Sequence, residues 1–157
     1  MGYTVSRALR ALPDYLRYMR KEGPFTSNLA EAGGFLRTSD DETEPDIQLH
    51  FVPGIVDDHG RKKHFVAGIS CHVCVLRPRS RGSVTLRDAN PRSAPNIDPR
   101  FLSAGDDLER TLKGARLVQR LLDAPAFEQV AGRGMYASSD ADDEELIEDL
   151  RNRGDTI

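Results

Sequence analysis

Two histidines in apolar stretches are the first residues of this sequence that could take part in chemistry. His50 lies in the alternating run 47–52, and His72 lies in the apolar run 64–76. An imidazole donates or accepts a hydrogen bond near neutral pH, so either ring could contact a substrate if these runs form the wall of an active site. A histidine on a strand can also be a structural group, and the sequence leaves both roles open.

The two cysteines, Cys71 and Cys74, flank His72 and raise the question of a disulfide or a zinc site. Residues three apart on a strand point to opposite faces, and their Cα atoms lie about 10 Å apart. A disulfide needs a Cα separation below about 7 Å, and tetrahedral zinc needs four convergent ligands. We therefore expect two reduced, largely buried thiols, no metal site, and a cytoplasmic protein.

A group of arginines in residues 77–87 could bind phosphate or nucleic acid. The whole chain argues against such a partner, because its net charge is -3 and its isoelectric point is near 5.8. We expect no nucleic acid and interpret the arginines as solvated side chains of a turn. Arg81 could instead hold the following connection through a buried pair with Asp98. A polyanion-binding module is the least favoured function.

The sequence carries no familiar catalytic or nucleotide-binding motif. It has no G-x-S-x-G motif, and its cysteines lack an activating context. It also has no G-x-G-x-x-G motif, with which a helix N-terminus would bind a dinucleotide pyrophosphate. We therefore predict no catalytic, cofactor-binding or metal-binding residue within these 157 residues.

Alternation of apolar and polar residues predicts the strands that must position the two histidines. The expected strands are residues 28–37, 47–52, 64–76 and 83–87. The run 64–76 is apolar on both faces, so we expect it at the centre of a sheet. Gly33 and Gly34 fit a strand where another backbone or a ligand comes close.

Residues 78–82 predict a turn before the strand at 83–87, and that strand should have one face covered. Prolines at positions 91, 95 and 99 follow it. Proline lacks an N–H and disfavours helix in the residue before it. We therefore expect the chain to cross the surface between the strand and the next helix.

Amphipathic helices are expected beside the strands. The run 5–21 contains Pro13, which predicts a break and a second helix that begins near Pro13. The next helix is expected over 106–122, with Ser103 as its N-cap and Pro125 after its end.

A last helix should follow Ser139 or Asp140 and end at Gly154. Helices beside an antiparallel or mixed sheet form an α+β arrangement, and 157 residues suit one domain. No run approaches the roughly 20 apolar residues of a membrane span. The first residues also lack the apolar run of a signal peptide.

Residues 76–102 carry the most specific pattern of the chain. Their order, LRPRSRGSVTLRDANPRSAPNIDPRFL, matches the form P-x-S-R-G-x-V-x-L-R and, further on, P-x-I-D-P-x-[FY]-L. This order resembles the glucose-methanol-choline (GMC) family of flavin-dependent oxidoreductases, in the branch with choline dehydrogenases and related alcohol dehydrogenases. Further segments agree in order, namely 28–35, 45–51 and 143–157, so the resemblance covers essentially the whole chain.

The resemblance implies a substrate domain with a largely antiparallel sheet, one face lining the active site above the flavin and the other packed by helices. In that family a catalytic histidine lies in a Y-H-P-x-G-T segment directly after a D-T-I-like sequence, which stands here at 155–157. We expect residues 1–157 to be a substrate-binding domain fragment, with the flavin-binding domain and the catalytic histidine segment outside it. FAD is expected in the full-length parent and not on this fragment.

The resemblance also points to Glu31. In choline-oxidising members a glutamate in the matching context lies in the substrate pocket, where its carboxylate can neutralise a quaternary ammonium; a structural role is the alternative. Aromatic faces would also hold such a cation, and the sequence offers Phe35, with Phe25 nearby. We therefore predict Glu31, Phe35, His50 and His72 as substrate-binding residues and leave the ammonium role open.

The resemblance thus implies the substrate-binding portion of an FAD-dependent, choline-like alcohol dehydrogenase or oxidase that oxidises a primary alcohol by hydride transfer to FAD. Its partners would be a small alcohol and the missing flavin-binding domain. The fragment alone is expected to be inactive and to self-associate through its uncovered sheet face. The alternative is a free-standing binding or scaffold domain that kept the fold and lost the chemistry.

Overall fold

A computed structural model describes residues 13–64, 66, 68–127, 132, 134–136 and 140–155. Its main sheet is antiparallel, in the order β1 (Ala32–Leu36), β2 (Ile47–Val52), β3 (Ser70–Val75). A second sheet pairs β4 (Ser83–Thr85) with β5 (Asn96–Asp98), also antiparallel.

Helices make up most of the remaining regular structure. Residues 13–19 are helical, which confirms a helix at Pro13, whereas the run 5–12 lies outside the described residues. The longer helices are α2 (Gly105–Leu122) and α3 (Asp143–Arg153), and single 3-10 turns are η1 (Pro24–Thr26), η2 (Asp58–Gly60) and η3 (Pro125–Phe127). In the part of the chain that the structure describes, no helix has the length and apolar character of a membrane span. The α+β prediction is confirmed.

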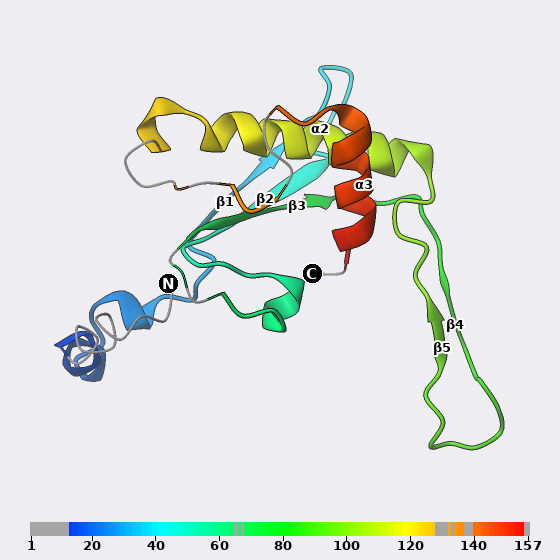
Figure 1. Cartoon of the computed structure of the whole chain (residues 1–157), viewed down its shortest axis with the longest axis horizontal. Coiled ribbons are helices and arrows are strands. Elements are labelled where there is room, and N and C mark those ends of the chain that lie inside the picture. The colour runs from blue at the N-terminus through cyan, green and yellow to red at the C-terminus, as the bar shows by residue number, and fades with distance from the viewer. Residues whose placement is uncertain are drawn as a thin grey trace.

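α2 lies along one face of the main sheet (Figure 1). Its buried residues recur at steps of three and four, which is one side of a helix: Asp107, Thr111, Gly114 and Val118. Gly114 allows the close approach, because a Cβ there would lie 2.6 Å from Cγ1 of Val73 and 3.2 Å from Cδ1 of Ile47. Ile47, Leu49 and Val118 form the buried core between helix and sheet.

The other face of the main sheet is turned away from α2, and we call it the open face. Successive residues of a strand point to opposite sides. Since Ile47 and Val73 face α2, the alternate positions of β2 and β3 face the other way: Gln48, His50, Val52, Ser70, His72 and Cys74. α2 thus packs on one face, and both predicted histidines lie on the other.

β2 matches the predicted strand 47–52 residue for residue, but the predicted strand 64–76 is wrong in two respects. It shortens to β3, and β3 lies at the edge of the main sheet, where it pairs with β2 alone among the described strands. Near the start of β3, side chains make hydrogen bonds in place of backbone pairing between strands. The Ser70 hydroxyl donates to the carbonyl of Gly54 and accepts from the N–H of Val56, and His64 bonds Asp57.

The proline-spaced connection is an antiparallel ribbon, which corrects the predicted surface crossing. β4 pairs with β5 and both strands project from the start of α2 (Figure 1); we call residues 83–98 the arm. No face of its first strand is covered as predicted, because Val84 and Leu86 are 69% and 86% exposed. The alternative Arg81–Asp98 pair is not formed: Arg81 donates to backbone carbonyls of residues 78 and 80, and Asp98 bonds Arg100.

The helix caps differ from those predicted by one or two residues. Ala104, and not Ser103, is the N-cap of α2. Asp142 is the N-cap of α3, where its side chain accepts from the N–H of Glu145 at 2.9 Å. Asp140 is therefore wrong as a cap, and Ser139 lies outside the described residues. Gly154 ends α3 as predicted.

Candidate functional site

A groove of about 320 Å³ runs along the β1 side of the open face. Its walls are residues 30–35, which lead into and form β1, and residues 48–50 of β2. Three of the four predicted substrate-binding residues meet here, namely Glu31, Phe35 and His50. We call it the β1–β2 groove.

The two histidines lie directly opposite each other. His50 of β2 is the cross-strand partner of His72 in β3 and of Gly33 in β1. Side chains opposite each other on neighbouring strands have Cβ atoms about 5 Å apart. The imidazoles therefore form a pair at the middle of the open face, and His72 lies one strand beyond the residues that line the groove.

Phe35 and Glu31 form the outer part of the groove. Phe35 is 61% exposed and stands opposite Gln48, so its ring is available to a bound molecule. Glu31 is exposed and precedes β1 by one residue. Phe35 is the one aromatic residue in the lining, which gives the groove one carboxylate and one aromatic face.

Gly33 lets the backbones of β1 and β2 lie close together beside the groove. A Cβ at Gly33 would lie 2.4 Å from the carbonyl oxygen of Leu49, whereas a Cβ at Gly34 would meet nothing within 4 Å. The prediction that another backbone comes close is thus confirmed at Gly33. Without a side chain there, the imidazole of His50 is bordered on the β1 side by backbone alone.

Sequence reasoning missed Gln48 as a groove residue. Its amide lies between Phe35 of β1 and Cys74 of β3 in the next row of the open face. An amide both donates and accepts hydrogen bonds, which suits recognition of a hydroxyl group. Its position two residues from His50 was the available signal, because residues i and i+2 share a strand face.

The cysteines are free, and burial raises the pKa of both thiols. Cys71 faces α2 with Val73, whereas His72 and Cys74 face the open side. Within the described ranges, no group of three or more His, Cys, Asp or Glu residues could hold a metal ion.

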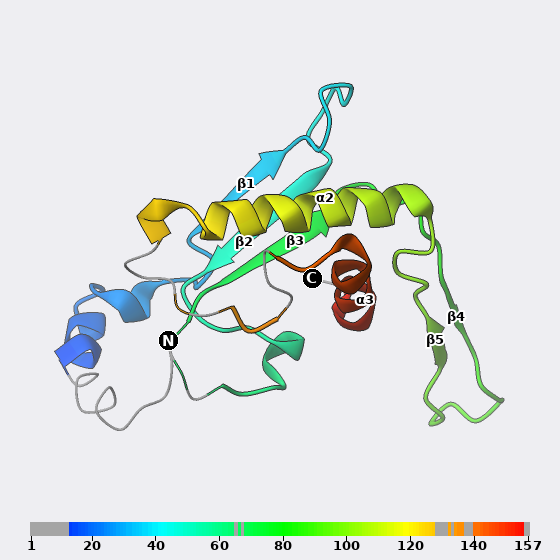
Figure 2. The ribbon, with the colours of Figure 1, turned by 45° about the horizontal axis from the view of Figure 1, so that its top comes forward.

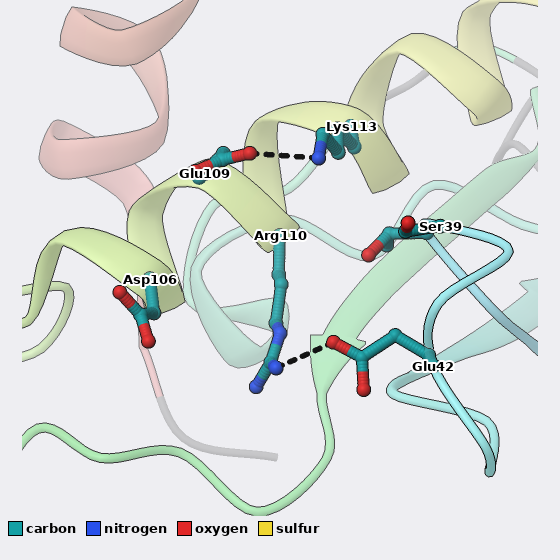
Figure 3. Close-up of a pocket in the computed structure, with 7 residues that line it drawn as sticks. Ser39, Glu42, Asp106, Glu109, Arg110 and Lys113 are labelled. Atoms are coloured by element: carbon teal, nitrogen blue, oxygen red, sulfur yellow. Dashed lines mark hydrogen bonds and ion pairs between the residues drawn. The ribbon is translucent and has the colours of Figure 1, made fainter.

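A second, polar pocket of about 140 Å³ lies between α2 and the loop after β1 (Figure 3). Arg110 reaches across from α2 to Glu42 at 2.6 Å and to the buried Asp46 at 3.4 Å. Burial would raise the pKa of Asp46, but hydrogen bonds from the hydroxyl and N–H of Thr38 outweigh it and the pKa is lowered. The charges of this pocket are already paired, and they fasten the loop to α2.

A buried carboxylate also fastens the loop between β2 and β3. Asp57 is 7% exposed, accepts from the hydroxyl of Tyr136 and bonds Nε2 of His64 at 2.8 Å. These bonds, the one from Tyr136 above all, lower the pKa of Asp57. Arg153 of α3 lies 3.6 Å from the centre of the Tyr136 ring. The cluster therefore joins this loop to α3.

Residues 79 and 80 of the P-x-S-R-G segment are attached to α2 by hydrogen bonds. Asp107 of α2 is 1% exposed and accepts from the N–H of Arg79 at 2.9 Å, and from the N–H and hydroxyl of Ser80 at 2.7 and 2.6 Å. The Ser80 oxygen in turn accepts from the N–H of Ala104 at 3.1 Å. Burial would raise the pKa of Asp107, but these bonds outweigh it and the pKa is lowered.

The starts of α2 and α3 do not fit the pyrophosphate of a dinucleotide such as FAD. A helix N-terminus binds an anion through free N–H groups and the positive end of its dipole. The first turn of α2 carries two carboxylates and that of α3 carries three: Asp106, Asp107, Asp143, Glu144 and Glu145. These charges would repel a phosphate, so neither helix start is a nucleotide site.

Two solved structures with the same fold are oxidases. Formate oxidase from Aspergillus oryzae RIB40, studied for the modification of its FAD, has a TM-score of 0.73 and 22% identity, over 92% of this chain and 30% of that chain. Pyridoxine 4-oxidase from Mesorbium loti has a TM-score of 0.64 and 18% identity, over 76% of this chain and 24% of that chain. At these identities the similarity shows the fold.

Sequence relatives and a family model show the family. Alcohol dehydrogenase (acceptor) from Pseudomonas putida is 36% identical over 98% of this chain and 28% of its own length. Oxygen-dependent choline dehydrogenase from Pseudomonas aeruginosa is 34% identical over 86% of this chain and 24% of its own length. The chain thus spans about a quarter of these relatives. Because the model described as GMC oxidoreductase matches residues 78–157, about half of the chain, the chain belongs to the GMC oxidoreductase family.

Proposed function

We propose that residues 1–157 form the substrate-binding portion of an FAD-dependent oxidoreductase that oxidises a primary alcohol. The β1–β2 groove carries this proposal, because it gathers Glu31, Phe35 and His50 on the face that α2 leaves open. FAD would accept the hydride, held by a portion that this chain does not contain. The location is proposed to be cytoplasmic, and the isolated chain is proposed to be inactive.

Each groove residue has a proposed task. The imidazole of His50 and the amide of Gln48 hydrogen-bond the substrate hydroxyl, because both can donate and accept. The Phe35 ring covers the apolar part of the alcohol. His72, opposite His50, orients that imidazole from the next strand. The catalytic proton acceptor is proposed to lie outside this chain.

The groove suits an uncharged alcohol better than choline. A quaternary ammonium is held best by several aromatic faces around a carboxylate. The lining of this groove contains the carboxylate of Glu31 and a single aromatic ring, that of Phe35. We therefore propose a small uncharged primary alcohol as the substrate, with Glu31 as a polar wall of the groove.

A chimera tests this function. This chain replaces the matching part of the Pseudomonas putida alcohol dehydrogenase (acceptor), to which it is 36% identical. The purified chimera is expected to retain FAD, seen by its flavin absorbance, and to oxidise primary alcohols with choline as a poorer substrate. The same relative with the matching part deleted is the control and should be inactive.

A chimera that retains FAD but oxidises no primary alcohol would contradict the proposed function. That result would favour a non-catalytic binding or scaffold domain, for which ligand screening of the isolated chain by NMR is the next measurement. Self-association through the open face is a further prediction, and sedimentation of the isolated chain tests it.

A further inference from the structure

The arm is an amphipathic ribbon with one apolar face. Val84 is the cross-strand partner of Ile97, and Leu86 follows on the same side as Val84. These side chains are 69%, 67% and 86% exposed, in that order. The opposite side of the ribbon is polar and consists of Ser83, Thr85, Asn96 and Asp98.

The base of the arm is fixed, so the apolar face has a defined direction. The first strand of the arm follows Arg79 and Ser80, whose backbone N–H groups donate to Asp107. The second strand is followed by Ala104, whose N–H donates to the hydroxyl oxygen of Ser80. At Gly82 the strands touch, since a Cβ there would lie 2.2 Å from the carbonyl oxygen of Asp98. A two-stranded hairpin is marginally stable alone in water, and this one is held as a projecting element.

The arm and the open face point to the same side of the molecule. Figure 1 shows α2 on one side of the main sheet and the arm extending from the start of α2 past the sheet to the other side. Figure 2, turned by 45°, shows the arm again standing clear of the sheet and of both long helices. A single body that covers the open face could therefore also contact the apolar side of the arm.

We propose that the apolar face of the arm docks onto the flavin-binding portion that this chain lacks. The proposal rests on the proposed function. The chain spans 28% and 24% of its relatives' lengths, so most of such a protein lies outside it and can supply the covering surface. The arm, residues 83–98, holds two arginines and two aspartates, so its net charge is zero. The covering surface is accordingly apolar.

Paired substitutions on the two sides of the arm test this docking in the chimera described above. Val84→Ser with Ile97→Ser removes the apolar cross-strand pair. Thr85→Ser with Asn96→Ser is the matched control, because it alters the neighbouring pair on the polar side and also ends in two serines. The first variant is expected to lower the melting temperature by about 3 °C or more and to release FAD faster, and the control should match the wild type.

The isolated chain supplies the second measurement. Because Val84 and Ile97 are exposed there, the apolar-face variant should melt at the wild-type temperature. Equal melting and FAD release of both variants in the chimera would overturn the docking. So would an isolated chain that melts lower with the apolar-face variant, since the pair would then pack within the chain. Dimers of the isolated chain that this variant dissociates would assign the face to a second copy.

The two proposals fail in different ways. A chimera without alcohol oxidation contradicts the proposed function, whatever the arm variants do. If the wild-type chimera retains FAD and oxidises alcohols while the arm variants are equal, the docking alone fails. If the wild-type chimera does not retain FAD, the proposed function fails, and the docking that rests on it is withdrawn.

Discussion

Asp107 and Ser80 explain at the residue level what the P-x-S-R-G order achieves. Asp107 is buried, and three hydrogen bonds from residues 79 and 80 compensate its carboxylate. Hydrogen bonds to charged groups contribute about 1.5–3 kcal/mol each, and a buried group that loses its partners costs more. Asp107→Asn should therefore lower the free energy of unfolding of this chain by about 2–4 kcal/mol in urea titrations. Asp106→Asn is the matched control: its pair with Arg79 is exposed and should cost at most about 1 kcal/mol.

The same variant has a defined pH dependence. The pKa of Asp107 is lowered from its ordinary value of 3.8. A carboxyl whose pKa falls on folding contributes stability above its unfolded pKa and loses it as pH falls through the folded pKa. The difference between wild type and Asp107→Asn should be complete near about pH 7 and shrink below about pH 4. A difference that persists unchanged at about pH 2 would contradict a charged Asp107.

The sequence was sufficient for some site residues and insufficient for others. His50 and His72 were found from their apolar runs, but their common face needed the β2–β3 register. Strand alternation from His50 would have found Gln48. Glu31 and Phe35 came from the family resemblance, and their meeting with His50 needed the β1–β2 register. The partners Ser80 and Asp107 are 27 residues apart, and no local pattern joins them. The pair of Arg81 with Asp98 was left open as an alternative, because a sequence does not say which polar group becomes buried.

At the level of elements, the contact of α2 with the main sheet depends on Gly114. Alanine is the better helix former by about 1 kcal/mol, so helix propensity alone predicts that Gly114→Ala stabilises. The added Cβ would lie 2.6 Å from Val73, whose branched side chain has little freedom. Overpacking costs about 1–3 kcal/mol, so we expect a lower melting temperature by circular dichroism. Gly105→Ala is the control, because a Cβ there meets nothing within 4 Å; a stabilised Gly114→Ala would contradict the close packing.

The elements were predictable where one local pattern decided them. β2 alternates cleanly and was predicted with its observed bounds, and α2 shows a helical stripe. Residues 64, 66, 68 and 69 were predicted as strand, but they lie outside the strands that the structure describes. β5 was missed because its three residues lie among prolines, and it exists through pairing with β4. Whether such a segment becomes a strand depends on a neighbouring strand, which a local sequence pattern does not reveal.

At the scale of the whole molecule, one side is packed and the other is open. α2 lies on one face of the main sheet, and the arm extends toward the other (Figure 1). The core lies between α2 and the sheet, whereas the β1–β2 groove lies on the open face. A chain that spans about a quarter of its GMC relatives would meet the remainder of such a protein on that side. We therefore propose that the alcohol binds in the β1–β2 groove.

The most direct test compares kcat/KM for a primary alcohol between two phenylalanine variants of the chimera. Phe35→Ala removes the aromatic ring that lines the β1–β2 groove, and Phe25→Ala removes a ring outside the groove that is also exposed. Loss of a ring that covers the substrate costs at least about 1.4 kcal/mol, so Phe35→Ala should lower kcat/KM about tenfold or more. Phe25→Ala should stay within about twofold of the wild type. Equal values for both variants would contradict a substrate site in this groove.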